Sequence, residues 1–282
     1  MIQALSEYQF LQNAFAASLL ASIVCGIIGV IIVEKKLVMM SGGIAHTAYG
    51  GVGLGYFFGF EPIIGAFLFS IAAALGIGTI KRKGGVQADI LIGLFWSLGM
   101  AFGIVFIALM PGYPPDLNSY LFGNILSVTQ ADLILMLIVT ALVLAVVVAL
   151  FNAWKAYLFD EEFASIIGVK TVFLEYLLLV LVAMTVVVLI RVAGIILVLA
   201  LLTAPAAMAG LFSKQLKNRM LLAVLFGAFF SISGLWVSYG LNIPSGACIV
   251  MIAVGCYFLT YALRATAHQM KRKSLASKPT VE

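Results

Sequence analysis

One histidine, His46, lies inside a long apolar stretch, where ionisable residues are functional candidates because they are costly to place in lipid. The surrounding sequence, MMSGGIAHTAYGGVGLGYFFG, is rich in glycine, which lets another backbone approach closely. On a helix, Gly42 and Tyr49 would lie on or near the face of His46. Imidazole is a common ligand of transition metals. The pattern fits a narrow metal path at a helix–helix seam, and equally a histidine that hydrogen-bonds a neighbouring helix.

A polar segment at 152–171, NAWKAYLFDEEFASIIGVKT, is the second candidate. Three acids stand near the start of a short helical pattern, where carboxylates suit the helix dipole, and a glycine follows its end. The pattern predicts a short amphipathic helix whose acidic face docks on a soluble partner. A helix resting on lipid is the alternative, although such helices favour basic polar faces. The residues assigned to this contact are Phe159, Asp160, Glu161, Glu162, Phe163 and Gly168.

The stretch LLTAPAAMAG is the third candidate, because Pro205 removes a helical hydrogen bond in the middle of an apolar segment. It predicts either a structural kink or a gating hinge. The Walker A, GxSxG and HExxH motifs are absent, so an ATP-driven process would need its nucleotide in a partner chain. The three cysteines lie in apolar stretches without CxxC spacing and are interpreted as small buried hydrophobic residues.

The elements that must position these residues are membrane-spanning helices. Of the 282 residues, 64% are hydrophobic and 10% are charged, with a mean hydropathy of +1.19, which leaves too little charge for a water-facing surface. A crossing helix needs about 20 apolar residues. The sequence predicts an all-α bundle of about nine transmembrane helices, or eight if the break at Arg191 is not real. The predicted spans are 13–33, 37–59, 63–80, 90–110, 133–151, 172–190, 192–213, 220–241 and 247–265.

The basic residues predict the orientation. With the N-terminus outside, 15 of the 16 Lys and Arg residues fall in cytoplasmic stretches, and Arg191 falls outside. The positive-inside rule expects this bias, and short basic clusters between apolar runs mark topology rather than nucleic-acid binding. We therefore expect the C-terminus in the cytoplasm. Residues 1–265 are predicted to form the transmembrane domain, and 266–282 a polar, basic cytoplasmic tail.

Six stretches in order along the chain resemble the permease subunits of ABC importers for manganese, zinc and iron. They are MSGGIAHTAYGG, QADILIGLFWSLGMAFGIV, SYLFGNILSVT, FDEEFASIIGV, GIILVLALLTAPAA and GLNIPSGACIV. The resemblance covers nearly the whole chain and implies a permease domain at 1–265 in the inner membrane. It implies a pair of permeases, here a homodimer, docked to a cytoplasmic ABC ATPase dimer. It also implies an extracytoplasmic binding protein that delivers the metal ion.

The resemblance also implies roles for particular residues. FDEEFASIIGV resembles the coupling helix that sits in a groove of the ATPase, and His46 matches a histidine in the ion pathway. Met39, Met40 and Tyr49 are weaker candidates for the same path. The family usually has an aspartate one helical turn before the histidine, where this chain has Gly42. The chain is expected to be a permease without enzymatic activity or bound cofactor, with ATP in its partner and a divalent metal as cargo.

Three other functions fit the sequence less well. A permease for a chelated metal or an organic ligand, of the siderophore or corrinoid type, would usually have ten spans and a wider path. An ion-coupled secondary transporter would normally need an acid inside a span, whereas the eleven acids here lie in loops or near span ends. An intramembrane enzyme would need paired catalytic residues that the spans lack.

Overall fold

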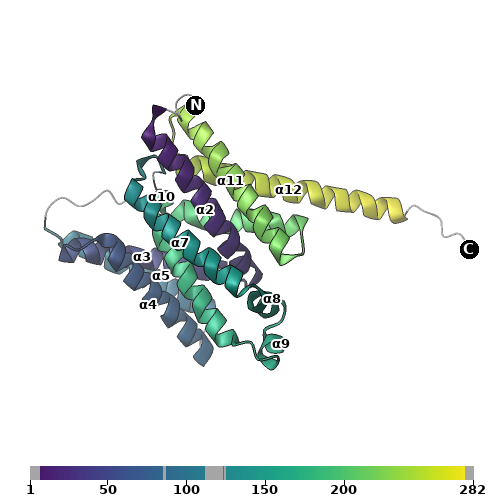
Figure 1. The fold of residues 1–282 in the computed structure, drawn as a ribbon, viewed down its shortest axis with the longest axis horizontal. Helices are drawn as coiled ribbons and strands as arrows, with labels where there is room; N and C mark the ends of the chain where they lie inside the picture. Colours follow the sequence, from purple (N-terminus) through teal and green to yellow (C-terminus); the bar gives the residue numbers. More distant parts are fainter. Residues whose placement is uncertain (1–6, 85–86, 112–122, 124, 277–282) are drawn as a thin grey trace, which may run out of the picture.

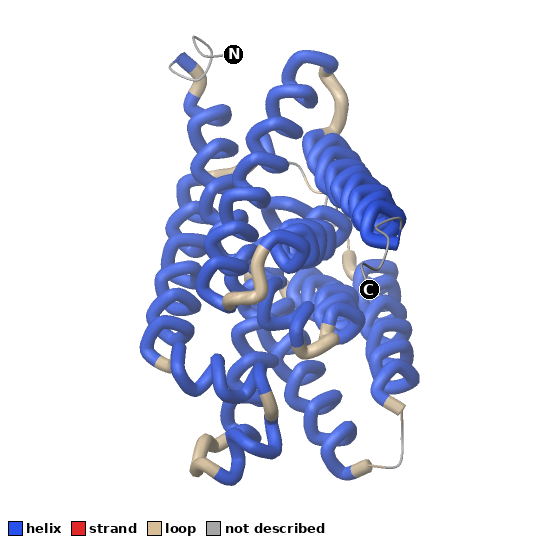
Figure 2. The backbone as a smooth tube through the Cα atoms, turned by 90° about the vertical axis from the view of Figure 1, so that its right-hand side faces the viewer, coloured by secondary structure: helices blue, strands red, loops and turns tan. Residues whose placement is uncertain are grey.

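The computed structural model describes residues 7–84, 87–111, 123 and 125–276, and within this part the chain is helical with short connections and no strand (Figure 2). The elements are α2 (Gln9–Glu34), α3 (Val38–Phe58), α4 (Pro62–Lys83), α5 (Ala88–Leu109), η1 (Ile125–Ser127), α7 (Gln130–Ala149), α8 (Phe151–Phe159), α9 (Glu161–Ile166), α10 (Thr171–Phe212), α11 (Leu216–Leu241) and α12 (Ser245–Ala276). The all-α prediction is confirmed for these residues.

Among the described residues, seven helices are long and apolar enough to cross a membrane: α2, α4, α5, α7, α10, α11 and α12. α3 has 21 residues but is too rich in glycine to belong to that set. α10 has 42 residues and is counted once. Adding α3 and counting α10 twice would give the predicted nine crossings, and that number stays a prediction.

α10 contains a sharp break at Gly194, whose backbone angles are φ 74° and ψ 161°. Glycine adopts positive φ without a steric penalty. Glu175, near the start of α10, pairs with Arg82 at the end of α4, whereas Arg191 pairs with Glu61 just before α4. The first half of α10 therefore runs antiparallel to α4. The sequence predicted the break at Arg191, three residues before its position in the structure.

The second half of α10 returns towards the end from which the first half came. Glu161, which precedes α10, and Arg219, which follows it, both pair with residues at the C-terminal end of α2. Pro205 lies buried in this second half, where the backbone stays helical. The interruption of α10 is thus at Gly194, and the hinge role of Pro205 stays a prediction.

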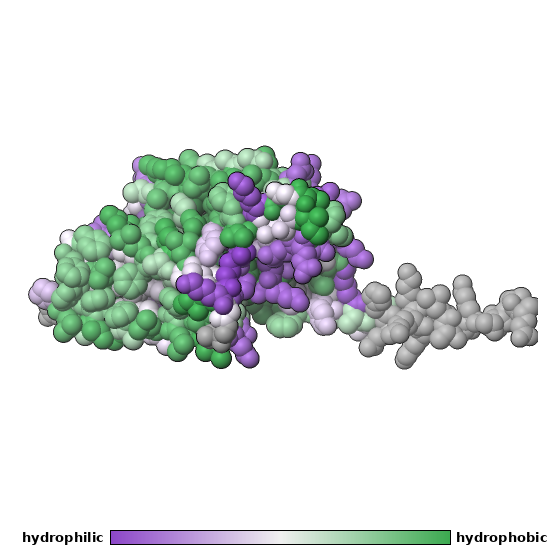
Figure 3. Space-filling view, turned by 90° about the horizontal axis from the view of Figure 1, so that it is seen from below, coloured by the Kyte–Doolittle hydropathy of each residue, from purple (hydrophilic) through white to green (hydrophobic). Residues whose placement is uncertain are grey.

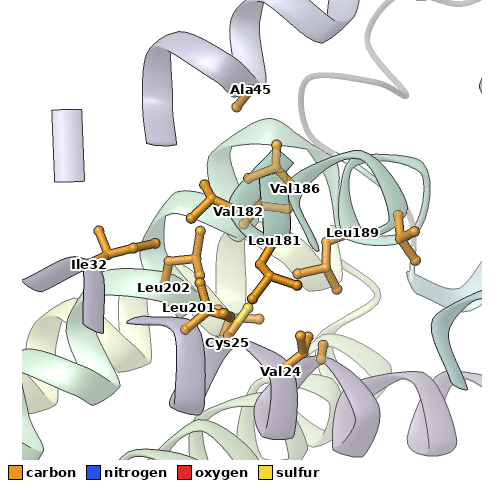
Figure 4. Packing of buried hydrophobic residues seen from close by; sticks show 14 of the residues in the cluster. Val24, Cys25, Ile32, Ala45, Leu181, Val182, Val186, Leu189, Leu201 and Leu202 are labelled. Carbon is orange, nitrogen blue, oxygen red and sulfur yellow. The ribbon is translucent and has the colours of Figure 1, made fainter. Parts of the chain in front are cut away.

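The core lies where α2 and α10 meet, and side chains from both helices interdigitate there with Ala45 of α3 (Figure 4). Cys25 and Cys248 are buried, as expected for small hydrophobic residues, whereas Cys256 is partly exposed. The C-terminal half of α12 extends beyond the other helices (Figure 1). The predicted tail therefore begins as helix, because no glycine or proline interrupts the chain between Gly255 and Ala276.

Glycines bring α3 into backbone contact with the helices on both sides. A Cβ atom at Gly51 would meet the backbone of Gly65 in α4, and one at Gly53 would lie 2.6 Å from the Gly103 carbonyl oxygen in α5. Only glycine permits such close approach, as in small-residue helix seams. The predicted close packing of this glycine-rich helix is confirmed.

We expect Gly51→Ala to lower the thermal unfolding midpoint in detergent, because the added methyl group forces α3 and α4 apart. Overpacking of this kind costs about 1–3 kcal/mol. Gly93→Ala is the matched control, since a Cβ atom there would have nothing within 4 Å. That substitution should be neutral or should stabilise α5 by about 0.5–1 kcal/mol, because alanine is the better helix former. Equal midpoints for the two variants would contradict the close contact.

Candidate translocation path and coupling surface

His46 of α3 faces Trp96 of α5, and their rings stack with centroids 3.8 Å apart at an interplanar angle of 11°. The neighbouring residue, Thr47, holds the two helices in register. Its hydroxyl shares a hydrogen bond between the carbonyl oxygens of Gly43 (2.7 Å) and Phe95 of α5 (3.0 Å). The position of the imidazole is therefore fixed by the glycine-mediated packing of α3 on α5.

The imidazole has an unsatisfied nitrogen. The Nδ1 atom of His46 is buried and has no hydrogen-bond partner among the described residues, although the side chain as a whole is partly exposed. Leaving a buried polar atom unpaired costs about 1–3 kcal/mol, so such atoms need an explanation. The alternative prediction, that His46 hydrogen-bonds a neighbouring helix, is not met at Nδ1 among the described residues. A bound ligand would satisfy the ring.

The other candidates on α3 are not gathered around His46. Met40 and Tyr49 are buried, and the Tyr49 ring lies where a Cβ atom of Gly103 would be. Met39 is 58% exposed and shares the face of His46, but seven residues place it about 10 Å away along the axis. Metal–ligand bonds are about 2 Å long, so Met39 and His46 cannot hold one ion together.

Gly42 lies one turn before His46 on the same face. A Cβ atom there would be 3.6 Å from the Leu199 side chain and 3.8 Å from the Trp96 ring, which are ordinary contacts. A small side chain would thus fit. Within the described residues there is no group of three or more His, Cys, Asp and Glu side chains that could hold a metal ion. In the described part of the chain, His46 is therefore not joined by two further His, Cys, Asp or Glu side chains.

Sequence reasoning missed two residues of α5 that share the helix face stacked against His46. Trp96 forms the stacking surface for His46, and Asp89 lies exposed two turns before Trp96 on the same face of α5. Gly43 lies next to Ile92, and Gly53, further along α3, lies next to Gly103, further along α5. The two helices therefore run parallel. The stretch QADILIGLFWSLGMAFGIV contains both missed residues, but an aromatic ring in an apolar span usually packs in a core.

The acidic segment forms the short helix that the sequence predicted. The Asp160 carboxylate accepts a hydrogen bond from the Phe163 backbone N–H at 3.0 Å and so caps α9. Gly168, with φ 87°, follows the helix in the left-handed conformation typical of a helix end. Phe159 is 88% exposed and Phe163 52% exposed. Large exposed apolar side chains beside acids mark a contact surface.

The two glutamates of α9 have different surroundings. The Glu161 carboxylate pairs with the Lys35 ammonium at 2.8 Å, whereas Glu162 is exposed and has no ion-pair partner in the described chain. The same Lys35 Nζ lies 3.4 Å from the centroid of the Tyr157 ring. Burial raises the pKa of Tyr157, so its hydroxyl stays neutral. α9 is thereby fastened to the end of α2.

A polar cavity of about 350 Å³ lies behind this contact, where α2, α4 and α10 meet α8 and α9. In it, the nearly buried Glu175 carboxylate accepts hydrogen bonds from Arg82 Nε at 2.7 Å and from Lys81 Nζ at 3.2 Å. The Lys35–Glu161 pair thus links α9 to α2, and the pairs of Glu175 link α10 to α4 beside it. The residues lining the cavity are Lys35, Leu37, Lys81, Arg82, Tyr157, Glu161 and Glu175.

The opposite end of the bundle is held by Arg191. Its guanidinium pairs with Glu61 at 2.9 Å and with Asp132 at 2.8 Å, and so ties α10 to the starts of α4 and α7. A cavity of about 130 Å³ lies beside it, lined in part by Val52 and Tyr56 of α3. α3 therefore runs between two ion-pair clusters, one at each end of the molecule.

The apolar helices define a multi-pass membrane protein. Residues 7–264 match the model of the ABC 3 transport family, and the chain belongs to this family. It is 43% identical over 264 residues to an uncharacterized membrane protein of Synechocystis, with 94% of each chain covered. It is 36% identical over 260 residues to the manganese transport system membrane protein MntC of Listeria monocytogenes, with 92% of each covered. The solved structure of PsaBC from Streptococcus pneumoniae in complex with Fab matches with a TM-score of 0.84 and 33% identity, covering 92% of this chain and 94% of that one.

Proposed function

We propose that this chain is the permease subunit of an ATP-driven importer that moves a divalent transition-metal ion into the cell. The observation that carries this is the unpaired imidazole nitrogen of His46, in the middle of a helix that lies between two ion-pair clusters. A nitrogen without a partner suits a site that a passing ion occupies. The resemblance to proteins named for manganese transport supports manganese first, with zinc and iron as the alternatives.

The proposed topology has nine crossings, with the N-terminus outside and the C-terminus in the cytoplasm. It is supported by the reversal at Gly194, which lets both halves of α10 cross. In this orientation, α9 and the basic ends of α2 and α4 face the cytoplasm, and Arg191 lies outside with its two carboxylate partners. Residues 1–265 are then the permease domain, with the basic tail inside.

A second copy of the chain completes the proposed path. His46 and Trp96 are partly exposed on the surface of a single chain although they lie within the bundle's apolar length. An imidazole facing lipid would be unfavourable, because lipid offers it no hydrogen-bond partner. The same face of a second permease would cover it and would add a second imidazole to the path.

α9 is the proposed contact with a cytoplasmic ABC ATPase dimer, because its exposed phenylalanines and Glu162 offer an apolar and acidic surface. ATP binding and hydrolysis in that partner would bias the permease between inward- and outward-facing states. A ligand shifts such an equilibrium only by its differential affinity for the two states. An extracytoplasmic binding protein would deliver the ion at the Arg191 end.

The test is uptake into vesicles that hold this chain with its cognate ATPase and binding protein, supplied with manganese, zinc or iron. We expect ATP-dependent uptake of one bare ion and none without the ATPase. If no bare ion moves while a chelated metal does, the chain is a permease for a chelated ligand. Uptake driven by an ion gradient in the absence of ATP would instead indicate a secondary transporter.

Gly42→Asp is expected to strengthen manganese binding, because it places a carboxylate one turn before His46 in a position where a Cβ atom fits. Manganese prefers carboxylate oxygen to a lone imidazole. The manganese dissociation constant of the purified permease should fall about tenfold, a change of the size that altered metal surroundings produce. Gly42→Asn is the matched neutral control. Equal manganese affinity in the two variants would show that a side chain at position 42 does not contact the ion.

A further inference from the structure

A second large cavity, of about 580 Å³, lies where the end of α2, α8 and the start of α11 meet. It shares no lining residue with the polar cavity behind α9, and Phe159 at its rim also belongs to the proposed ATPase contact. Its lining combines basic and apolar side chains in one place. The lining residues are Glu34, Phe151, Lys155, Leu158, Phe159, Lys214, Gln215, Leu216, Lys217 and Arg219.

The cavity carries unbalanced positive charge. Arg219 is paired with Glu34, but Lys155, Lys214 and Lys217 are exposed and have no acidic partner among the described residues. The first turn of α11 also lacks a side-chain cap. Its free N–H groups add a partial positive charge at the same place. Three ammonium groups around an uncapped helix start favour an anion with several oxygen atoms.

An apolar track leads away from the basic residues. Leu221, Leu225 and Phe229 follow Lys217 at intervals of four, so the side chains form a row of neighbours that winds slowly around α11. Each of the three apolar side chains is more than half exposed. Figure 3 shows hydrophilic residues gathered on one part of the molecule's surface, next to a broad hydrophobic area. A charged pocket that continues into an apolar track matches a molecule with an anionic head and a hydrocarbon tail.

We propose that this cavity binds the phosphate-bearing headgroup of an anionic phospholipid in the cytoplasmic leaflet. The three lysines hold the phosphate, and an acyl chain lies along the Leu221, Leu225 and Phe229 track. The cytoplasmic leaflet carries anionic lipids, which attract basic residues next to transmembrane helices. A free phosphate ion would use the lysines alone, and an acidic surface of a protein would leave the track empty. The leaflet follows from the proposed orientation, whereas the headgroup site itself does not depend on transport.

The test is lipid binding to the delipidated full-length protein in detergent, measured by native mass spectrometry with phosphatidylglycerol, phosphatidylcholine or inorganic phosphate as probes. The variant is the triple replacement of Lys155, Lys214 and Lys217 by glutamine. The matched control replaces Lys36, Lys83 and Lys170, three exposed lysines at the same end without ion pairs and outside the cavity. All six substitutions are at exposed positions, and size-exclusion chromatography checks that both variants fold.

We expect the wild-type protein to prefer phosphatidylglycerol to phosphatidylcholine. Each lysine removed from the cavity should weaken that preference about fivefold. The control variant should keep it, and inorganic phosphate should not displace the lipid. The proposal is overturned if the two triple variants lose binding equally, which would indicate general charge attraction. It is also overturned if inorganic phosphate competes fully, which would indicate a free-anion site, or if bound ATPase excludes the lipid from the wild-type protein.

Discussion

His46→Ala is expected to reduce ATP-dependent metal uptake by at least about tenfold, because it removes the imidazole that would hold the ion in the membrane. The protein should still fold. The substitution loses the stacking contact with Trp96, worth about 0.5–1.5 kcal/mol. It also removes a buried nitrogen that has no partner among the described residues, and these two effects oppose each other. Uptake into vesicles and the thermal unfolding midpoint measure the two properties separately.

The control for this variant is His268→Ala, which removes the other histidine of the chain, located in the C-terminal part of α12. It should transport as the wild type does. His46→Gln tests the chemistry further, since an amide keeps hydrogen-bonding capacity but is a poor ligand for transition metals. It should be as inactive as the alanine variant. Wild-type uptake by both His46 variants would reduce this residue to a packing role.

Most of the helical architecture was predictable because the apolar runs are long and their ends carry clear signals. Pro62 begins α4 and Gly59 ends α3 in the left-handed conformation, which are positions typical of these residues. The interruption of α10 was harder to place. Arg191 and Pro205 both looked like breaks, yet the backbone departs from helical angles at Gly194. Only glycine among these residues tolerates the positive φ that the turn requires.

The candidate site was predictable only in part. His46 stood out because ionisable residues in apolar spans are rare, and a single residue is enough to raise that signal. Its stacking partner could not be found in this way, because the match of His46 with Trp96 depends on how α3 and α5 align. That alignment is set by glycines that are about 50 residues apart in the chain, such as Gly53 and Gly103.

The ion pairs could not be predicted either, because they also depend on how distant segments of the chain align. Lys35 and Glu161 are separated by 126 residues, and Arg191 and Glu61 by 130. Charge clustering assigned each residue to one end of the spans but could not choose its partner there. The structure therefore shows a contact that the sequence pattern did not predict: Glu161 of α9 pairs with Lys35 at the end of α2.

That connection changes how the coupling helix should be tested. Replacing Glu161 and Glu162 together by lysine is expected to abolish ATPase docking and metal uptake. Like charges placed opposite each other at an interface cost several kcal/mol. The double variant also breaks the pair with Lys35 inside the permease, however. A loss of function could then arise from a displaced α9 rather than from the altered docking surface.

Two further variants separate these causes. Glu162→Lys alone changes an exposed acid without an internal partner and should still reduce co-purification of the ATPase and uptake by about tenfold or more. Combining Lys35→Glu with Glu161→Lys reverses the internal pair and leaves Glu162 in place, so the position of α9 and most of the uptake should be restored. Glu7→Lys, at the exposed start of the described chain, is the matched control. If the reversed pair recovers full uptake, Glu161 acts within the permease; if Glu162→Lys also docks normally, the acids of α9 do not form the ATPase contact.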